Sequence, residues 1–256
     1  MKNYKLTIQY DGTRYSGWQA QKDTPDTIQN KIENILSTLF NKSIEIAGSG
    51  RTDAGVHAYG QVANFHIDEE SINNLISTCD TSAEDLILNS LNKYLPKDIA
   101  VISVNEVDER FHSRLSAKRK TYIYRIHTSN ISNVFERKFV YDYQVPLDVA
   151  KMRQAASFLT GTHDFKSFCG NPHIKKTTVR TIESINIEQK ENEIVLSFTG
   201  NGFLMRMVRI LTGTLIEVGN GRRDPLSMTS ILESLDREKA GYTAPPQGLY
   251  LKEVFY

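Results

Sequence analysis

Two kinds of hydrophobic spacing alternate along the chain, and this alternation restricts the fold more than any other feature. Over residues 4–10 apolar and polar residues alternate, which is the pattern of a strand with one buried face. Over residues 28–40 the apolar positions recur at helical spacing, which predicts an amphipathic helix with Thr24 or Asp26 as its N-cap. Further strands are expected at 44–46, 61–66 and 100–107, and a further helix at 82–91, begun by a near capping box at 82–85.

The second half of the chain repeats the same kind of order. Strands are expected at 120–127, 179–187, 194–199 and 249–255, and helices at 147–159 and 203–218. We therefore predict an α/β (α+β) protein in which each half is a mixed or antiparallel sheet with helices. The expected domains are residues 1–108 and 109–256, although no clean sequence repeat relates them.

Composition excludes several protein classes. With 39% hydrophobic and 24% charged residues, the 256-residue chain is neither collagen-like, coiled-coil nor wholly disordered. Cys79 and Cys169 fit no zinc-ligand spacing, so we expect two buried thiols, a reducing compartment and no structural metal. No apolar run approaches the roughly 18 residues of a membrane span, which favours a soluble, cytoplasmic protein.

The net charge of +1 gives no reason to expect a polyanionic partner, but basic residues cluster in the second half. The clusters are Arg114 with Lys118, Arg119, Lys120 and Arg125; Lys175, Lys176 and Arg180; and Arg206, Arg209, Arg222 and Arg223. Such a charge run is usually a solvated face, so each cluster has a bland interpretation. Together they leave nucleic acid open as a partner.

The densest unusual segment is the glycine-rich stretch 48–58, which directly follows an expected strand. Its glycines require sharp turns or close approach of the backbone. Phosphate-loop patterns fail because Asp53 stands where GxGxxG needs glycine, and Ala47 breaks the nucleophile-elbow pattern. What remains is Asp53 close to Arg51, which suits an oriented nucleophile or a structural ion pair, and His57, which we expect to be packed.

Several segments in the same order closely resemble the TruA family, tRNA pseudouridine synthase I. They are residues 50–58 (GRTDAGVHA), 11–19 (DGTRYSGWQ), 111–117 followed by Tyr122, 163–168, 202–209 and 245–251. The resemblance covers almost the whole chain, and six ordered matches do not arise by chance.

The resemblance implies conversion of uridine to pseudouridine at positions 38 to 40 of the tRNA anticodon stem-loop. It also implies two pseudo-symmetric α/β halves whose sheets join into one extended sheet, the pseudouridine synthase fold. The first half would carry the aspartate loop, and the second the basic tRNA-contact segments. Further implications are a homodimer, no cofactor, no required metal and no membrane partner.

The resemblance also assigns roles to single residues. Asp53 matches the nucleophilic aspartate, and Arg51 matches an arginine that stabilises the flipped-out nucleotide. Tyr122 matches the tyrosine that stacks on the base and can help remove the C5 proton. Arg209 matches the arginine that pairs with the aspartate, and Leu249 an apolar residue that excludes water.

Each of these residues has a structural alternative. Without the resemblance, Tyr122 and Leu249 would be core residues, and Arg209 a surface side chain that packs its stem on apolar neighbours. For Trp18, the only tryptophan, burial against the nearby loop is favoured over stacking on RNA.

The same resemblance implies a tRNA-contact segment and a second contact loop. The residues concerned are Phe111, His112, Ser113, Arg114 and Leu115 in the segment, and Lys175 and Lys176 in the loop. Ser113 and Leu115 replace the alanine and phenylalanine common in this segment, and the order of residues 118–120 also differs, which leaves local contacts open. Residues 130–137 match poorly, so no contacts are assigned there.

Three alternatives remain beside this interpretation. One is an RNA-binding protein or chaperone with a degenerate site, against which the intact Asp53, Tyr122 and Arg209 argue. Another is a pseudouridine synthase that acts on a different RNA, which only substrate profiling would distinguish. A phosphate-loop NTPase is the weakest, because no Walker lysine is present.

Overall fold

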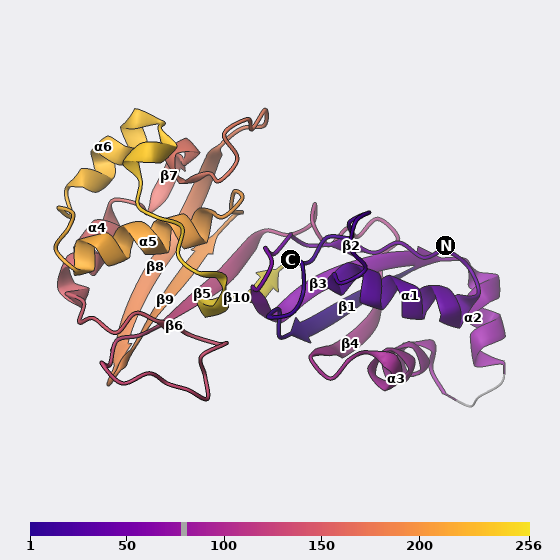
Figure 1. Cartoon of the computed structure of the whole chain (residues 1–256). Coiled ribbons are helices and arrows are strands. Elements are labelled where there is room, and N and C mark those ends of the chain that lie inside the picture. Colours follow the sequence, from indigo (N-terminus) through magenta and orange to yellow (C-terminus); the bar gives the residue numbers. More distant parts are fainter. Residues whose placement is uncertain (78–80) are drawn as a thin grey trace. The chain divides into compact units, whose positions relative to one another are not determined.

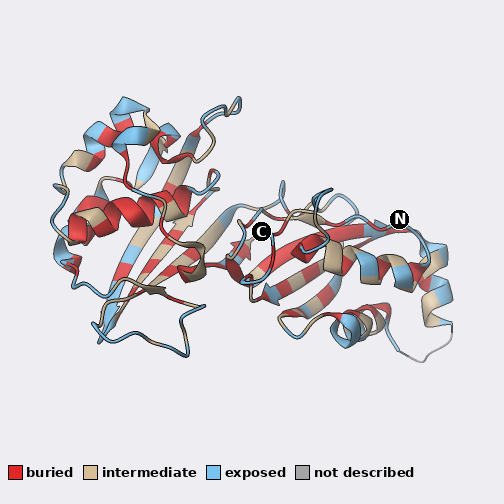
Figure 2. Cartoon of the chain, viewed as in Figure 1, coloured by how far each residue is buried: buried red, intermediate tan, exposed pale blue. Residues whose placement is uncertain are grey.

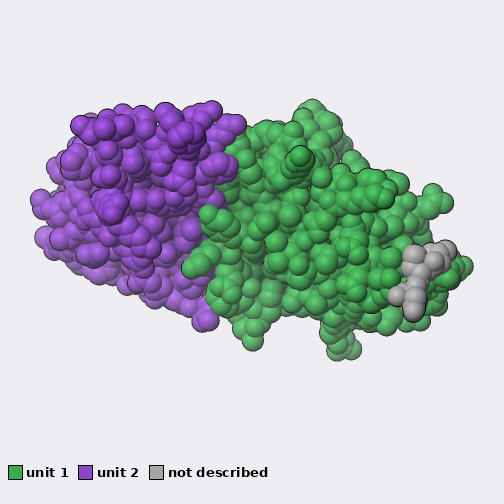
Figure 3. All heavy atoms as spheres, turned by 90° about the horizontal axis from the view of Figure 1, so that it is seen from below, with its two compact units in different colours: residues 1–118, 251–256 green, residues 119–250 purple. Residues whose placement is uncertain are grey.

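The computed structural model describes residues 1–77 and 81–256, and its contacts divide these residues into two units. Unit 1 contains residues 1–118 and 251–256, and unit 2 contains residues 119–250 (Figure 3). The boundary thus falls ten residues after the expected one, because the backbone of 109–118 is bonded into unit 1. Asn3 Nδ2 donates to Phe111 O at 2.9 Å, and the Tyr256 hydroxyl donates to Ser113 O at 2.7 Å.

Unit 1 is an antiparallel sheet with helices. Its strands are β1 (Lys2–Tyr10), β2 (Ala47–Gly48), β3 (His57–Ile67), β4 (Ile99–Val107) and residues 251–255 of β10 (Leu249–Phe255). Its helices are α1 (Ile28–Phe40), α2 (Glu69–Ile76) and α3 (Ala83–Tyr94). The strand order is β4-β1-β3-β10, β2 pairs with β3, and β1 runs antiparallel to both its neighbours (Figure 1).

The core of unit 1 follows directly from the period-2 pattern of β1. Leu6 and Ile8 are fully buried, whereas Gln9, next to Ile8, is exposed. Most of the neighbouring β3 is buried as well (Figure 2). Tyr4 stacks on Phe65 of the neighbouring β3, with ring centroids 5.7 Å apart. One face of the sheet is therefore the core, and the helices supply its other wall.

Helix α1 lies where the spacing places it, but its cap differs from the expected one. The N-cap is Thr27, whose hydroxyl accepts from Asn30 N at 3.3 Å. Asp26 is instead engaged with Lys31 at 2.8 Å, and Thr24 Oγ1 accepts from Asp26 N at 3.1 Å. Thr24 and Asp26 therefore belong to the turn before the helix.

The strand expected at 44–46 does not form; only the two-residue strand β2 follows directly after it. Ile44 N donates to Ser37 Oγ at 3.0 Å, and Ile46 N donates to Glu33 Oε1 at 2.9 Å. Because side chains of α1 satisfy these backbone groups, the segment needs no strand partner.

Unit 2 contains mostly antiparallel strands with helices. Its strands are β5 (Arg119–His127), β6 (Tyr141–Asp142), β7 (Gly161–Asp164), β8 (Val179–Lys190) and β9 (Glu193–Gly200). Its helices are α4 (Val149–Ser157), α5 (Met207–Gly219) and α6 (Ser227–Ser234). The strand order is β5-β9-β8-β7, and β6 pairs in parallel with β5.

Helix α5 is buried almost all round because the segment 240–244 covers its outer side. A Cβ on Gly213 would lie 1.9 Å from Tyr242 O, and Gly241 N donates to Thr214 Oγ1 at 2.9 Å. The helix begins at Met207, four residues later than expected, because Arg206 adopts a left-handed conformation with φ of 58°.

The expected combination of sheets and helices in each half is confirmed. Cys169 is buried as expected, whereas Cys79 lies outside the described residues. Within residues 1–77 and 81–256, no helix has the length and apolar character needed to cross a membrane.

Candidate active site

The residues to which the sequence assigned chemistry lie in both units. Arg51 and Asp53 belong to unit 1, on the loop between β2 and β3, here called the Asp53 loop (residues 49–56). Tyr122, Arg209 and Leu249 belong to unit 2.

The start of the Asp53 loop is fixed by hydrogen bonds to β3. Ser49 N donates to Val62 O at 2.7 Å, and the Ser49 hydroxyl donates to Gln61 Oε1 at 2.6 Å. Gln61 Nε2 in turn donates to Gly50 O at 3.0 Å. Ser49 and Gln61 are both fully buried, so these bonds are shielded from competing water.

The middle of the loop rests on the segment 11–19, here called the N-terminal motif. Trp18 N donates to Thr52 O at 3.1 Å, and the hydroxyls of Tyr10 and Thr52 are 2.9 Å apart. Gly17 has φ of +97°, and a Cβ there would lie 2.7 Å from Thr52 O. Glycine is therefore required at this position both by the backbone conformation and by the closeness of the loop.

Trp18 is buried, as its sequence context predicts. It is only 1% exposed, and a Cβ on Gly48 would lie 2.4 Å from its indole nitrogen. The indole thus fills the space beneath the beginning of the Asp53 loop and is not available to stack on RNA.

The end of the loop is a tight turn. Val56 N donates to Asp53 O at 3.2 Å, and Gly55 supplies the positive φ of 77°. A Cβ on Gly12 would lie 2.0 Å from Val56 O, so the N-terminal motif also supports this end. Asp53 itself is half-buried on a backbone held from both sides.

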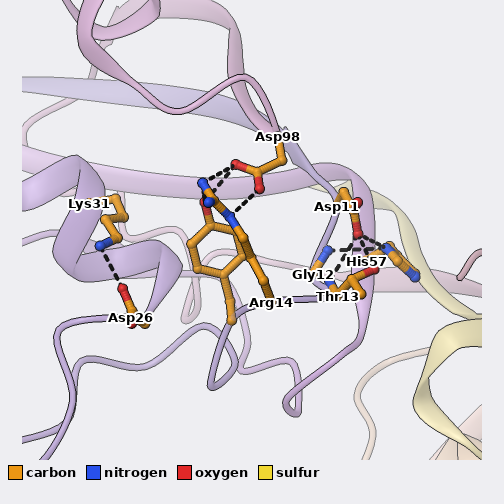
Figure 4. Close-up of polar contacts among 9 residues, drawn as sticks. Asp11, Gly12, Thr13, Arg14, Asp26, Lys31, His57 and Asp98 are labelled. Carbon is orange, nitrogen blue, oxygen red and sulfur yellow. Dashed lines mark hydrogen bonds and ion pairs between the residues drawn. The ribbon is translucent and has the colours of Figure 1, made fainter.

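His57, at the start of β3, is a packed residue as expected. Its ring is buried, and Nδ1 accepts the N–H of Gly12 at 3.1 Å (Figure 4). The Asp11 carboxylate lies 3.2 Å from the same Nδ1, and this contact is an ion pair only when the imidazole is protonated. Asp11 also accepts from Thr13 N at 2.9 Å and closes the turn.

A second polar group in Figure 4 fixes the other part of the N-terminal motif. The Tyr15 hydroxyl donates to Asp98 Oδ1 at 2.6 Å, and Arg14 Nε lies 2.5 Å from Asp98 Oδ2. Burial, with the bond to Asp98, raises the pKa of Tyr15 to about 12, so the phenol remains a proton donor at neutral pH.

Arg51 is exposed, and its guanidinium is oriented by the N-terminal motif. Arg51 Nε donates to Gln19 Oε1 at 2.8 Å. Sequence reasoning did not single out Gln19 as a functional residue, although it stands in the GWQ triplet of the matching motif.

In unit 2, Tyr122 and Arg209 are held by separate contacts. Tyr122 on β5 is 8% exposed and meets Phe203 edge to face, with ring centroids 5.3 Å apart at 83°. Arg209 on α5 donates from Nε to Ala244 O at 2.7 Å, and Ala244 N donates to Arg209 O at 3.0 Å. This reciprocal pair fixes the stem of the arginine to the segment 244–249.

The segment 244–249 is also fixed to β5, which positions Leu249. The Tyr124 hydroxyl donates to Pro245 O at 2.7 Å, and a Cβ on Gly248 would lie 2.7 Å from Arg125 O. Burial raises the pKa of Tyr124 well above its ordinary value, so this donor is permanent at neutral pH. Leu249 is 6% exposed.

The expected tRNA-contact segment 111–115 divides into an anchor and an exposed tip. Ser113 is fully buried; its N–H donates to Asn64 Oδ1 at 2.8 Å and its hydroxyl to Ala47 O. Arg114 is exposed and Leu115 is 80% exposed. His112 Nδ1 accepts from Arg114 N at 3.0 Å and shapes the tip. Ser113 therefore fixes the segment and presents no surface to RNA. Phe111 packs on Tyr256, with the two ring centroids 4.8 Å apart.

The basic clusters identified in the sequence differ in how exposed their side chains are and in whether these are paired. Lys175 and Lys176 are exposed on the loop before β8. The third cluster is not one patch, because Arg223 pairs with Glu217 at 2.8 Å and Arg209 bonds to Ala244, which leaves Arg206 and Arg222 as its exposed members.

Comparison with known proteins gives a consistent result over the full chain. The family described as tRNA pseudouridine synthase matches residues 6–116 and 155–256. A protein named tRNA pseudouridine synthase A 2 from Clostridium tetani is 44% identical over 256 residues, which cover 100% of this chain and 99% of that one. A protein named tRNA pseudouridine synthase A from a Bacillus species (strain KSM-64) is 46% identical, with 100% of both chains covered.

Among solved structures, a chain from the crystal structure of a Cbf5-Nop10-Gar1 complex is similar over 83% of this chain and 54% of that chain. The sequence identity is 10% and the TM-score is 0.32.

Proposed function

The chain belongs to the tRNA pseudouridine synthase family, and we propose that it modifies uridines at positions 38 to 40 of the anticodon stem-loop with Asp53 as nucleophile. Membership makes it an isomerase that converts uridine to pseudouridine in tRNA. The observation that carries the finer proposal is the way in which Asp53 is presented. Its loop is bonded to β3 at one end and to the N-terminal motif in the middle, so the carboxylate stands on a fixed backbone.

The reaction explains why a fixed carboxylate is useful. The glycosidic bond between C1′ and N1 of uridine breaks, the uracil turns, and C5 bonds to C1′. The C5 proton leaves and N1 gains a proton, so atoms and charge balance. A covalent bond between Asp53 and the sugar or the base holds the separated pieces during the turn, which a mobile side chain would do poorly.

The target uridine is stacked in RNA, so it has to be flipped out at a cost of a few kcal/mol. We assign Tyr122 to stacking on the flipped base and to removal of the C5 proton, and Arg51 to stabilising the flipped-out nucleotide. The edge-to-face contact with Phe203 supports a fixed ring for Tyr122.

Arg209 and Leu249 complete the proposed site. Arg209 supports the charge of the nucleophile, and its stem is already fixed by Ala244 before RNA binds. Leu249 excludes water, which would hydrolyse the covalent intermediate. Its segment is hydrogen-bonded to Tyr124 and lies against Arg125 O at Gly248, which supports a rigid position for Leu249.

Binding of the tRNA backbone is assigned to exposed basic residues. Within residues 1–77 and 81–256, Arg114 at the tip of 111–115 and the pair Lys175 and Lys176 form no ion pair with a carboxylate, which suits phosphate contacts. Two copies of the chain forming a homodimer would present such residues over a longer stretch of one tRNA.

The test is release of tritium from tRNA labelled at uridine C5, with the wild type and Asp53→Asn side by side. We expect release by the wild type only, with modified positions in the anticodon arm and with tRNA binding retained by the variant. Measurable turnover by Asp53→Asn would overturn its assignment as nucleophile.

The same assay separates the alternatives. Release that maps outside the anticodon arm would contradict the proposed positions and leave the reaction class intact. Binding of tRNA without release from it would favour another RNA substrate, to be sought by profiling.

A further inference from the structure

Arg51 is the last member of a series of side chains that begins on helix α1. Arg51 Nε donates to Gln19 Oε1 at 2.8 Å, and Gln19 Nε2 donates to Gln29 Oε1 at 2.7 Å. Gln29 Nε2 donates to Glu33 Oε1 at 2.7 Å. These four residues, here called the amide relay, connect a cation at the proposed site to a carboxylate on the helix.

Backbone groups fix the direction of every bond in the amide relay. Ala20 N donates to Gln29 Oε1 at 3.0 Å, so this atom must be the oxygen of the amide. Gln29 Nε2 also lies 3.3 Å from Ile46 O, which accepts only. With Gln29 fixed, Gln19 must point its NH₂ at Gln29 and its oxygen at Arg51. Neither amide can reverse without placing like groups together.

Burial makes this arrangement effective. Gln29 is 8% exposed and Gln19 is half-buried, whereas Arg51 is exposed. An exposed arginine samples many rotamers, and ordering its side chain costs conformational entropy. A directed acceptor on a shielded support reduces the number of rotamers, because the guanidinium loses its bond when it swings away.

The carboxylate end is joined to the same part of the fold. Glu33 Oε1 also accepts from Ile46 N at 2.9 Å, directly before β2 and the Asp53 loop. Helix α1 is docked on the N-terminal motif through its backbone as well, since Ile28 N and Gln29 N donate to Gly17 O and Trp18 O. The amide relay therefore spans elements that are already fixed to one another.

We propose that Gln19 and Gln29 are positioning residues that hold the Arg51 guanidinium in the orientation used on the flipped-out nucleotide, with Glu33 as their anchor. This inference rests on the proposed function for the role of Arg51, whereas the orientation itself is a property of the protein without RNA. All three hydrogen bonds of the amide relay point the same way. Arg51, which can only donate, stands at one end, and the Glu33 carboxylate, which can only accept, stands at the other.

The first test needs no substrate. NMR of the full chain measures exchange of the Arg51 Nε–H with water, and the signal is assigned by its disappearance in Arg51→Lys. We expect Gln19→Met, which keeps length and removes the amide, to speed this exchange about tenfold. The matched control is Gln21→Met on the same segment, because Gln21 Nε2 donates to Ser16 O and does not join the relay. Unchanged exchange in Gln19→Met would overturn the inference.

The second test asks whether the orientation matters for the reaction. In the wild-type background, Gln19→Met is expected to lower kcat/KM for tRNA about tenfold with little change in tRNA binding. In an Arg51→Ala background the same substitution should change it less than about twofold, because the group to be positioned is gone. Equal losses in both backgrounds would mean a general structural effect and would overturn the positioning role.

The two tests separate this inference from the proposed function. If the wild type released no tritium from tRNA while Gln19→Met still changed the exchange of Arg51, the proposed substrate would fail and the orientation of Arg51 would stand. Gln29→Met provides a second variant, expected to act in the same direction as Gln19→Met on the Arg51 signal.

Discussion

The backbone N–H of Trp18 donates to the carbonyl oxygen of Thr52 at 3.1 Å, and Thr52 directly precedes Asp53. One hydrogen bond thus joins the N-terminal motif to the loop that carries the proposed nucleophile. The N-terminal motif and the Asp53 loop are separated by about thirty residues in the chain, and this bond shows that the motif supports the loop in the fold.

The closeness of Gly17 to this loop predicts a substitution effect. Gly17→Ala should lower stability by about 1–3 kcal/mol, because φ is +97° and the new Cβ would meet Thr52 O at 2.7 Å. It should also lower tritium release strongly by displacing Asp53. Gly221→Ala is the control: φ is +79° there, but no atom lies within 4 Å, so only the strain applies. Equal activities of the two variants would contradict the supporting role of the motif.

Arg209 is expected to contribute charge and not packing alone. Arg209→Ala should reduce turnover by about 100-fold or more, because in the proposed site Arg209 supports the charge of Asp53. Single-turnover kinetics at saturating tRNA measure this effect. Arg222→Ala removes an exposed arginine from the same sequence cluster and should leave the rate within about twofold. A rate close to wild type for Arg209→Ala would remove it from the site.

Tyr122→Phe separates stacking from proton transfer. The variant keeps the ring and its contact with Phe203, so tRNA binding should persist, while removal of the hydroxyl should slow release of the C5 proton about 100-fold. Tyr94→Phe, on an exposed residue at the end of α3, serves as control. Wild-type rates for Tyr122→Phe would leave this residue with stacking only.

Asp68, the N-cap of α2, predicts a local pH dependence. Lys42, 2.5 Å from its carboxylate, and the backbone and hydroxyl donors of Ser71 lower the pKa of Asp68 in the folded chain. Because the folded pKa lies below the unfolded value of about 3.9, this contribution to stability is present above about pH 4 and is lost as pH falls through the folded pKa. Lys42→Met should raise the pKa, as measured by NMR titration of the carboxyl carbon. Lys31→Met, which affects Asp26 instead, should leave the Asp68 midpoint where it was.

Phosphate binding by the second contact loop is testable through salt. Replacing Lys175 and Lys176 together by alanine should reduce the slope of log affinity against log salt by about 1 for each phosphate that the two lysines neutralise. Lys190→Ala is the comparison, since this exposed lysine lies 3.6 Å from Glu188 and is assigned no RNA contact. A slope identical to wild type would show that the two lysines do not bind phosphate.

Elements with strong periodic burial can be predicted from the sequence, and elements without it cannot. β1 and α1 are predictable because their apolar positions repeat over nine and 13 residues. α2 escapes prediction because Ile72 is its only buried residue, which leaves no stripe to detect. The expected caps of α1, Asp26 or Thr24, are wrong although aspartate is intrinsically a better cap than threonine, because Asp26 is engaged with Lys31 and Thr27 caps the helix.

The candidate site shows the same division. The glycines of the Asp53 loop and of the N-terminal motif are visible as motifs, and their spacing reflects close backbone approach. Gln19 and Gln29 carry no such sign, because two glutamines ten residues apart are ordinary surface residues until the fold places their amides 2.7 Å apart. The burial of Ser113 is likewise invisible in the sequence, since its partners Asn64 and Ala47 are distant in the chain.

The return of residues 251–256 to unit 1 has a consequence for the order of events during synthesis. β3 is paired by β10, Gly60 lies against Lys252, and Lys118 N donates to Phe255 O at 2.8 Å. The ribosome makes the body of unit 1 first, then all of unit 2, and only afterwards the last strand of unit 1. The part of β3 around Gly60 therefore has no β10 partner until the whole of unit 2 has been translated, whereas β2 already pairs with Ala63 and Asn64. A chain released before residue 251 leaves that part of β3 without its neighbouring strand.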